Sequence, residues 1–265
     1  MSQRMLSTDE SWRRWGRLDP YFGVLADERF SSSKIEQYRY EFFATGAKFI
    51  AHVLRRYSTN FGDLPRRRAL DHGCGVGRLT LPLASHFLDV LALDVSPEML
   101  VEARSNALRA GVANATFAPA DDELSNAPGV FDFVNSHMVL QHVPVARGLP
   151  LLLRLVEKVR PGGGFHVHLS CRIDPWPWRF LYWASANIPG VKVWQNVCAG
   201  RCWDAPAMQM NNYPLDRILA RLAAEGITDL VVITEPHSRF FSFSLIGRKP
   251  PLTGFESPTI RDGKL

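Results

Sequence analysis

The spacing of apolar residues changes near residue 66, and this change divides the chain into two regions. Between Lys34 and Tyr57 the apolar residues recur at three- and four-residue intervals, which predicts one or two amphipathic helices. Gly62, Asp63 and Pro65 then interrupt the pattern. Beyond them, short apolar runs bounded by glycine, proline and polar residues predict strands, with helical patterns between the strands.

Five strands alternate with helices in this second region. The predicted strands are Ala69–Asp71, Val90–Asp94, Ala115–Ala118, Phe131–Asn135 and Phe165–Leu169. The predicted helices are Leu79–Phe87, Pro97–Ala110 with Ser96 as its N-cap, and Leu149–Val159, which ends before the run Pro161–Gly164. Such alternation implies a parallel sheet with right-handed crossovers and helices on both faces. We therefore predict a doubly wound α/β fold.

Residues 171–213 interrupt this alternation with an aromatic-rich insert. The insert holds five of the seven tryptophans, namely Trp176, Trp178, Trp183, Trp194 and Trp203. Flat side chains with a polar edge suit stacking on sugars or planar rings, so the insert is predicted to cover the acceptor. Two alternatives are packing of the insert onto the sheet and contact of Trp176–Trp183 with a membrane interface that carries a lipid-linked acceptor. After the insert, a helix at Leu215–Ala224 and a hairpin of Leu230–Thr234 with Phe240–Gly247 are predicted.

Composition bounds the class of protein. A chain of 265 residues with 46% hydrophobic and 22% charged residues is typical of one large globular domain or one domain with an insertion. The sequence lacks a signal-peptide pattern and an apolar run of the roughly 18–20 residues that a membrane span needs. The four cysteines, Cys74, Cys171, Cys198 and Cys202, do not form a disulfide framework or a paired metal-ligand motif. We predict free thiols, no metal and a cytoplasmic location.

The basic charge raises the question of a nucleic-acid partner. The net charge is +5 and the pI is about 9.2. Apart from the run Arg66–Arg68, however, lysine and arginine are scattered and are not interleaved with aromatic residues. We therefore expect no nucleic-acid partner.

The segment after the first predicted strand carries a cofactor-binding pattern. Gly73, Gly75 and Gly77 permit a sharp turn and the close approach of a ligand, and Asp71 places a carboxylate beside that turn. A dinucleotide site requires the spacing G-x-G-x-x-G, whereas these glycines follow G-x-G-x-G and Arg78 stands at the place of the third dinucleotide glycine. The spacing disfavours a nicotinamide cofactor.

Two further acidic positions end the next strands. Asp94 ends the second strand, 17 residues beyond Gly77, where a carboxylate can accept both hydroxyl groups of a ribose. The alternative for Asp94 is a turn residue. Asp121 and Asp122 follow the third strand, and Asp121 is the preferred acceptor for an adenine amino group.

Together with the later segments Phe131–Ser136 and Val159–Gly164, this order of elements resembles the class I S-adenosylmethionine (SAM)-dependent methyltransferases, in particular their bacterial small-molecule branch. The resemblance covers roughly residues 69–170. It implies a Rossmann-like seven-stranded, mostly parallel sheet whose last strand is antiparallel. It also implies SAM as cofactor, with its methionine part over Gly73–Gly77 near Asp71, its ribose at Asp94 and its adenine near Asp121. Ser136 is counted among the cofactor contacts.

The predicted organisation has three parts. Residues 1–65 form an N-terminal helical cap, residues 66–249 form the SAM-binding domain with residues 171–213 as the substrate lid, and residues 250–265 form a tail.

Two histidines follow the fourth strand at the edge where the methyl group is expected to point. His137 and His142 are candidate bases for a hydroxyl acceptor, and their alternative role is to pack against or shield the cofactor. His166 and His168 share one face of the fifth strand and are predicted to lie in the core.

The predicted reaction is methyl transfer to a small molecule, with a hydroxyl of a glycan or another metabolite as the preferred acceptor. A nucleic-acid or protein methyltransferase is one alternative. It is disfavoured because Asn135-Ser136-His137-Met138 stands where an Asn/Asp-Pro-Pro-aromatic motif would be expected. A SAM-binding regulatory protein without catalysis is the other alternative.

Overall fold

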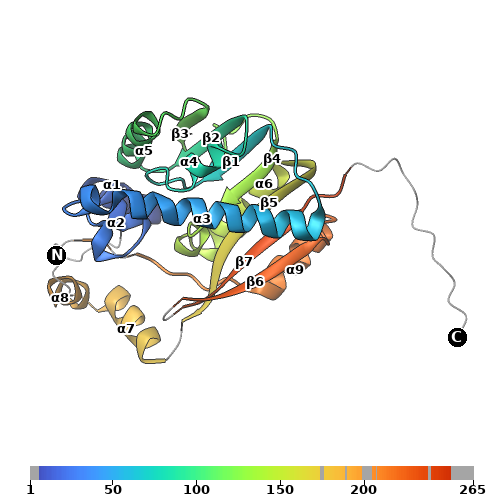
Figure 1. The fold of residues 1–265 in the computed structure, drawn as a ribbon. Coiled ribbons are helices and arrows are strands. Elements are labelled where there is room, and N and C mark those ends of the chain that lie inside the picture. Colours follow the sequence, from blue (N-terminus) through green and yellow to red (C-terminus); the bar gives the residue numbers. More distant parts are fainter. Residues whose placement is uncertain are drawn as a thin grey trace, which may run out of the picture.

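The computed structural model describes residues 6–173, 176–188, 190–198, 205–206, 208–237 and 240–251. A seven-stranded sheet lies at the centre of this described part, with helices on both faces (Figure 1). The strands, in chain order, are β1 (Arg68–His72), β2 (Asp89–Asp94), β3 (Ala115–Pro119), β4 (Phe131–Ser136), β5 (Val159–Ile173), β6 (Leu230–His237) and β7 (Phe240–Arg248).

The order across the sheet is β3-β2-β1-β4-β5-β7-β6. Strands β1 to β5 are parallel, and β7 is antiparallel to both β5 and β6. The predicted doubly wound, mostly parallel fold and its closing antiparallel hairpin are therefore confirmed. The direction of winding changes between β1 and β4, and ligands of such sheets bind at the carboxyl ends of the strands at this point.

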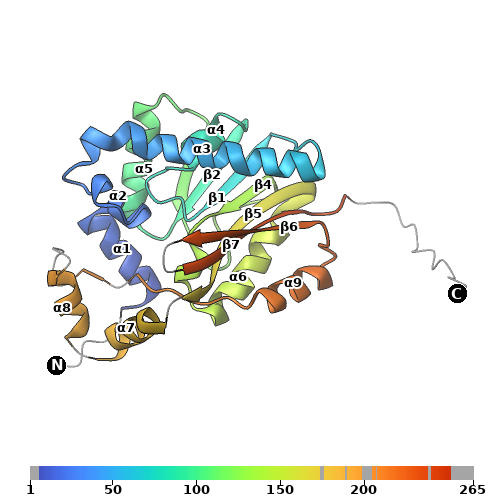
Figure 2. The same cartoon turned by 60° about the horizontal axis from the view of Figure 1, so that its bottom comes forward.

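The helices form a layer on each face of the sheet (Figures 1 and 2). Helices α3 (Ile35–Phe61), α4 (Thr80–Ala84) and α5 (Pro97–Arg109) cover one face, and α6 (Val145–Glu157) and α9 (Leu215–Ala224) cover the other. Helix α1 (Thr8–Leu18), α2 (Pro20–Val24) and the short 3-10 helix η1 (Glu28–Phe30) precede α3, and the 3-10 helix η2 (Leu140–His142) follows β4. The insert contains α7 (Trp176–Asn187) and α8 (Val191–Cys198).

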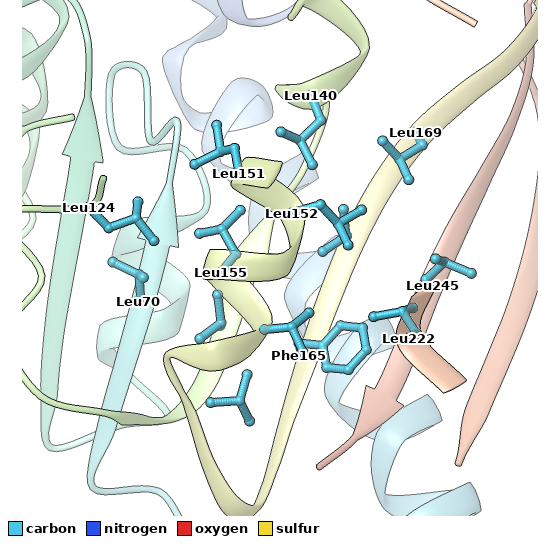
Figure 3. Packing of buried hydrophobic residues seen from close by; sticks show 14 of the residues in the cluster. Leu70, Leu124, Leu140, Leu151, Leu152, Leu155, Phe165, Leu169, Leu222 and Leu245 are labelled. Carbon is cyan, nitrogen blue, oxygen red and sulfur yellow. The ribbon is translucent and has the colours of Figure 1, made fainter. Parts of the chain in front are cut away.

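Alternating apolar side chains of the strands supply both cores. Ala69 of β1 packs with the layer of α3 and α4, whereas its neighbour Leu70 packs with α6 on the opposite face. Figure 3 shows Leu70, Leu155 and Phe165 as members of the α6 core. Burying a leucine or phenylalanine side chain contributes about 1.5–3 kcal/mol, so these two clusters hold the strand ends in fixed positions.

The glycine run Gly162–Gly164 lies inside β5, which differs from the sequence prediction. It was expected to end a helix, but α6 ends at Glu157 and β5 already begins at Val159. The glycines lie within the strand because neighbouring groups occupy the space of a side chain. A Cβ on Gly163 would lie 2.7 Å from the Asp132 carbonyl oxygen, and one on Gly164 would lie 2.1 Å from Tyr57 Cε2.

Two other predicted elements also have different bounds. The predicted helix Leu79–Phe87 is the shorter α4, Thr80–Ala84, and Ser85 Oγ donates to the Pro82 carbonyl directly after it. The helical pattern of Lys34–Tyr57 is one helix of 27 residues, α3.

The insert lies beyond the carboxyl end of β5. β5 continues to Ile173, α7 packs against β5 and against α8, and both helices project at that end of the sheet (Figures 1 and 2). Cys74 and Cys198 are free thiols. Cys202, Trp203 and the predicted tail after Pro251 lie outside the described residues.

Candidate active site

A pocket opens at the carboxyl ends of β1, β2 and β4, where the winding of the sheet reverses. It contains about 920 Å³ of empty space, counting its open mouth. Asp71, Gly73, Asp94 and His137 line it from the sheet side, and Trp12 of α1 lines it from the cap. Most of the predicted cofactor residues, but not Gly77 or Ser136, therefore meet the N-terminal helices in one cavity.

The glycine turn is held in a backbone conformation that side chains disfavour. Gly73, Gly75 and Gly77 have φ values of 70°, 53° and 89°. A Cβ on Gly73 would lie 2.2 Å from Val139 Cγ2, and one on Gly75 would lie 2.5 Å from Val24 Cγ2. Gly73 and Gly75 line the pocket, so their backbone forms part of its wall; Gly77 does not line it.

Asp71 is a buried carboxylate at the end of β1. Its Oδ2 accepts a hydrogen bond from Thr80 Oγ1 at 2.6 Å, and its Oδ1 accepts one from Asn135 Nδ2 at 2.8 Å. Burial raises the pKa of Asp71 to about 6, against the smaller opposing effects of these bonds and of the Arg78 charge. A cationic ligand group beside this carboxylate would favour its ionised form.

Arg78 is a candidate ligand-binding residue that sequence reasoning missed. Its guanidinium lines the pocket, although the residue is only 6% exposed. Among the described residues its Nε has no hydrogen-bond partner, and its Nη1 donates to Thr45 Oγ1 at 3.4 Å. Burial lowers the pKa of Arg78 to about 10. A buried cation with unused donors fits an anionic ligand group.

Asp94 holds the glycine turn and also faces the pocket. Its Oδ2 accepts from the Gly75 amide at 2.8 Å, and its Oδ1 accepts from the Ser96 amide at 2.9 Å. Burial raises its pKa, and the amide bonds act in the opposite direction. Each carboxylate oxygen retains a lone pair, so Asp94 can still accept hydrogen bonds from a diol.

Asp121 and Asp122 both line the pocket but have different partners. Asp121 Oδ1 accepts from the Ser125 amide, and this bond lowers the pKa of Asp121. Asp122 accepts from Arg147 Nε, and the other end of the Arg147 guanidinium forms two bonds with Asp9 of α1, at 2.8 and 2.9 Å. Arg147 therefore links helix α1 to the loop after β3 through hydrogen bonds and ion pairs.

Ser136 lies behind the pocket wall. It is fully buried, and its hydroxyl lies 3.2 Å from Nδ1 of His72, which does line the pocket. Burial lowers the pKa of His72 to about 4, so this imidazole is neutral near pH 7. The structure thus places His72 between Ser136 and the cavity.

A chain of buried hydrogen bonds runs from Asp71 on β1 across β4 and β5 to β7. Asn135 Nδ2 donates to Asp71, so its Oδ1 accepts the Nδ1 proton of His166 at 2.8 Å. The unprotonated Nε2 of His166 then accepts from Ser244 Oγ at 3.0 Å. His166 is fully buried, and burial lowers its pKa to about 3. This neutral imidazole fixes the orientation of the amide that holds Asp71.

His142 forms the wall between the pocket and the cap. Its Nδ1 donates to the Gln209 carbonyl at 2.6 Å, so the proton is on Nδ1, and its Nε2 lies 3.2 Å from Gln141 Nε2. The Trp12 ring meets it edge-on, with the ring centroids 4.8 Å apart. Burial lowers the pKa of His142 to about 4. These contacts suit a neutral residue that closes the pocket.

His137 also lines the pocket, on the side of α3 and β5. Its ring lies 3.9 Å from the Phe49 ring and 4.9 Å from that of His168, measured between centroids. The next residue, Met138, has a φ of 60°, which is uncommon for a residue other than glycine and typical of functional turns. His168, like His166, is buried as expected. Within the described ranges, no cluster of histidine, cysteine or carboxylate residues could hold a metal ion.

Comparison with known proteins identifies the domain that carries this pocket. Residues 69–163 match the family model described as "Methyltransferase domain". These residues form a methyltransferase domain. The boundaries of the match enclose the glycine turn, all three predicted acidic positions and both candidate histidines of this methyltransferase domain.

Curated relatives match the same part of the chain. The ubiquinone biosynthesis O-methyltransferase of Pectobacterium carotovorum is 33% identical over 122 residues, which are 46% of this chain and 48% of that protein. The protein of the same name from Xanthomonas campestris is 34% identical over 101 residues, 38% of this chain and 41% of its own length. The chain thus spans less than half the length of these relatives.

Solved structures share the fold of the methyltransferase domain. Magnesium protoporphyrin IX methyltransferase from Synechocystis with bound SAM superposes with a TM-score of 0.60 at 18% identity, covering 93% of this chain and 100% of that one. The N-methyltransferase NodS from Bradyrhizobium japonicum in complex with S-adenosyl-L-homocysteine gives a TM-score of 0.56 at 15% identity, covering 92% and 100%. At these identities the likeness establishes the fold.

Proposed function

We propose that this chain is a SAM-dependent methyltransferase that acts on a small molecule. The observation that carries the proposal is that a buried carboxylate, Asp71, and a buried guanidinium, Arg78, line the same pocket beside a glycine turn, and that Arg78 Nε has no hydrogen-bond partner among the described residues. The amino-acid end of SAM has a matching ammonium and carboxylate.

The remaining residues of the pocket fit the other parts of this cofactor. Asp94 would accept hydrogen bonds from the ribose hydroxyls, and Asp121 would accept one from the adenine amino group. Gly73 and Gly75 leave room because a Cβ at either position would collide with a neighbouring valine. Ser136 and Gly77 would act indirectly, Ser136 through His72 and Gly77 through the turn. When bound, SAM would supply a methyl group on a sulfonium. The leaving group would be a neutral thioether, which needs no proton from an acid of the protein.

For the acceptor we propose a hydroxyl group of a small metabolite, glycans included. The name of the curated relatives supports oxygen as the acceptor atom. His137 is the proposed base, because it lines the pocket beside Phe49 and His168. His142 is proposed to orient the acceptor and exclude water, because its Nε2 lies 3.2 Å from the Gln141 amide nitrogen and burial lowers its pKa to about 4. A reactive geometry, in which the acceptor atom is held close to the methyl carbon, supplies most of the rate acceleration.

Calorimetric titration with SAM and S-adenosylhomocysteine tests the cofactor, with Asp94→Ala as the variant and NADH as the control ligand. Micromolar binding of either compound by the wild type, lost or much weakened in Asp94→Ala, is the expected result. A folded wild-type protein that binds neither compound would refute the proposal.

Release of S-adenosylhomocysteine in the presence of hydroxylated acceptors then tests turnover. A protein that binds SAM and releases no product with any acceptor would be the regulatory alternative. Methyl transfer to RNA or to a protein instead of small molecules would indicate the nucleic-acid or protein methyltransferase alternative. The cytoplasmic location stays a prediction from the sequence. No helix within the described residues has the length and apolarity needed to cross a membrane.

A further inference from the structure

The insert helices turn large apolar side chains toward solvent. On α7, Trp176, Phe180 and Trp183 are 72%, 57% and 55% exposed, and their spacing places them on one face of the helix. On α8, Trp194 and Val197 are 64% and 59% exposed and also share a face. We call these five residues the insert face. A surface helix of a globular protein normally directs such side chains inward.

The exposed aromatic area equals that of the largest apolar patch on a typical monomer. Since an aromatic side chain offers about 150–250 Å² of surface, the four exposed rings of the insert face present about 400–600 Å². The largest apolar patch on a typical monomer is about 300–600 Å² and is often functional. Ile188, which is 42% exposed and lies between the two helices, adds to this area.

The charge of the same segment favours one kind of partner. The insert, residues 171–213, contains four basic residues and two acidic ones, a formal net charge of +2: Arg172, Arg179, Lys192 and Arg201 against Asp174 and Asp204. The whole chain also carries a net charge of +5. Tryptophan and phenylalanine prefer the headgroup region of a bilayer, and each basic residue near an anionic surface contributes about 1 kcal/mol.

The position of the insert gives such a contact a use. Helices α7 and α8 project at the carboxyl end of β5, beside the cap helices (Figure 2). The pocket opens at the same end of the sheet, where β1, β2 and β4 finish. A surface that meets the insert face would therefore lie on the same side of the molecule as the mouth of the pocket.

We propose that the insert face docks the protein peripherally on anionic lipid surfaces. The aromatic rings would enter the headgroup region while the rest of the chain stays in water, as for interfacial helices. The proposal does not depend on the methyltransferase activity, because neither the insert face nor its charges belong to the cofactor pocket.

Co-sedimentation of the full chain with vesicles tests the proposal. Vesicles of phosphatidylcholine with one quarter phosphatidylglycerol are compared with vesicles of phosphatidylcholine alone, without SAM. We expect at least about tenfold tighter binding to the anionic vesicles, weakened by 0.5 M NaCl. The triple variant Trp176→Ser/Phe180→Ser/Trp183→Ser should lose at least about tenfold in affinity. Its thermal unfolding should match the wild type, since the three side chains are exposed.

A matched variant separates the insert face from general apolar exposure. Tyr40→Ser/Leu108→Ser removes two side chains that are 89% and 83% exposed on α3 and α5, and it should bind vesicles like the wild type. Wild-type protein that stays in the supernatant with both vesicles would overturn the proposal. Equal vesicle binding by the triple variant would overturn it as well. A third result would also overturn it: no vesicle binding, together with light scattering that shows a wild-type dimer and a monomeric triple variant. The insert face would then join two copies of this chain.

Discussion

The raised pKa of Asp71 predicts that cofactor binding depends on pH in a specific way. In the free protein the carboxyl group titrates near pH 6, because it is only 1% exposed and burial disfavours its charged form. The proposed cofactor brings an ammonium to this carboxylate and would favour its ionised form. Binding should therefore release a proton wherever free Asp71 is protonated, and affinity should rise with pH up to about pH 7.

The magnitude follows from the fraction of ionised Asp71. With a pKa of about 6 in the free protein and a value below about 4 in the complex, the Kd should be about tenfold weaker at pH 5 than at pH 7. The proton released per cofactor should be about 0.5 at pH 6 and close to zero at pH 7.5. His72 and His142, whose pKa values are lowered to about 4, are already neutral at pH 6 and contribute little.

Calorimetry with S-adenosylhomocysteine in two buffers of different ionisation enthalpy measures both quantities. Asp71→Asn should bind more weakly at every pH and lose the proton release at pH 6. Asp94→Asn, which removes the neighbouring acid, should bind more weakly but keep most of the release. A wild-type protein that exchanges no proton at pH 6 and has one Kd from pH 5 to pH 7 would refute this reasoning.

Three further predictions concern packing around the pocket. Gly46→Ala should lower the free energy of unfolding in urea by about 1–3 kcal/mol, because a Cβ there would lie 2.1 Å from a carbonyl oxygen of the turn after β1. Ser244→Ala should lower it by about 1 kcal/mol through loss of a buried hydrogen bond, whereas Ser242→Ala, on the same strand but outside that network, should change it by less than about 0.5 kcal/mol. Arg147→Met removes the ion pairs that link α1 to the loop after β3, so it should speed cofactor release about twofold to fivefold in stopped-flow measurements. Arg154→Met, which breaks an ion pair elsewhere on α6, should leave the rate unchanged.

The strands and acidic positions were predictable because their signals are local. Leu70 and Leu93 stand in short apolar runs, and Asp71 and Asp94 end those runs where parallel strands expose their carboxyl ends. The N-cap role of Ser96 was predictable for the same reason, and its hydroxyl accepts from the Met99 amide as expected.

Features that depend on distant parts of the chain were not predictable. Gly164 lies within β5 because Tyr57 of α3, more than 100 residues earlier, occupies the space of its side chain. The burial of Arg78 depends on the close approach of α3 at Gly46. The tautomer of His142 depends on the Gln209 carbonyl, which lies 67 residues away in sequence. Tertiary contacts of this kind leave no local pattern of apolar and polar residues.

The hydrogen-bond chain from Asp71 to Ser244 has a consequence for biosynthesis. Its first member lies on β1, early in the sheet, and its last member lies on β7, at the end of the described fold. While the polypeptide emerges from the ribosome, residues 69–163 are made before β7 can insert between β5 and β6. Until then Ser244 does not hold the His166 imidazole, and this imidazole does not yet orient the Asn135 amide. Cofactor affinity should therefore mature only after translation has passed residue 244, and nascent chains should not sequester the cofactor.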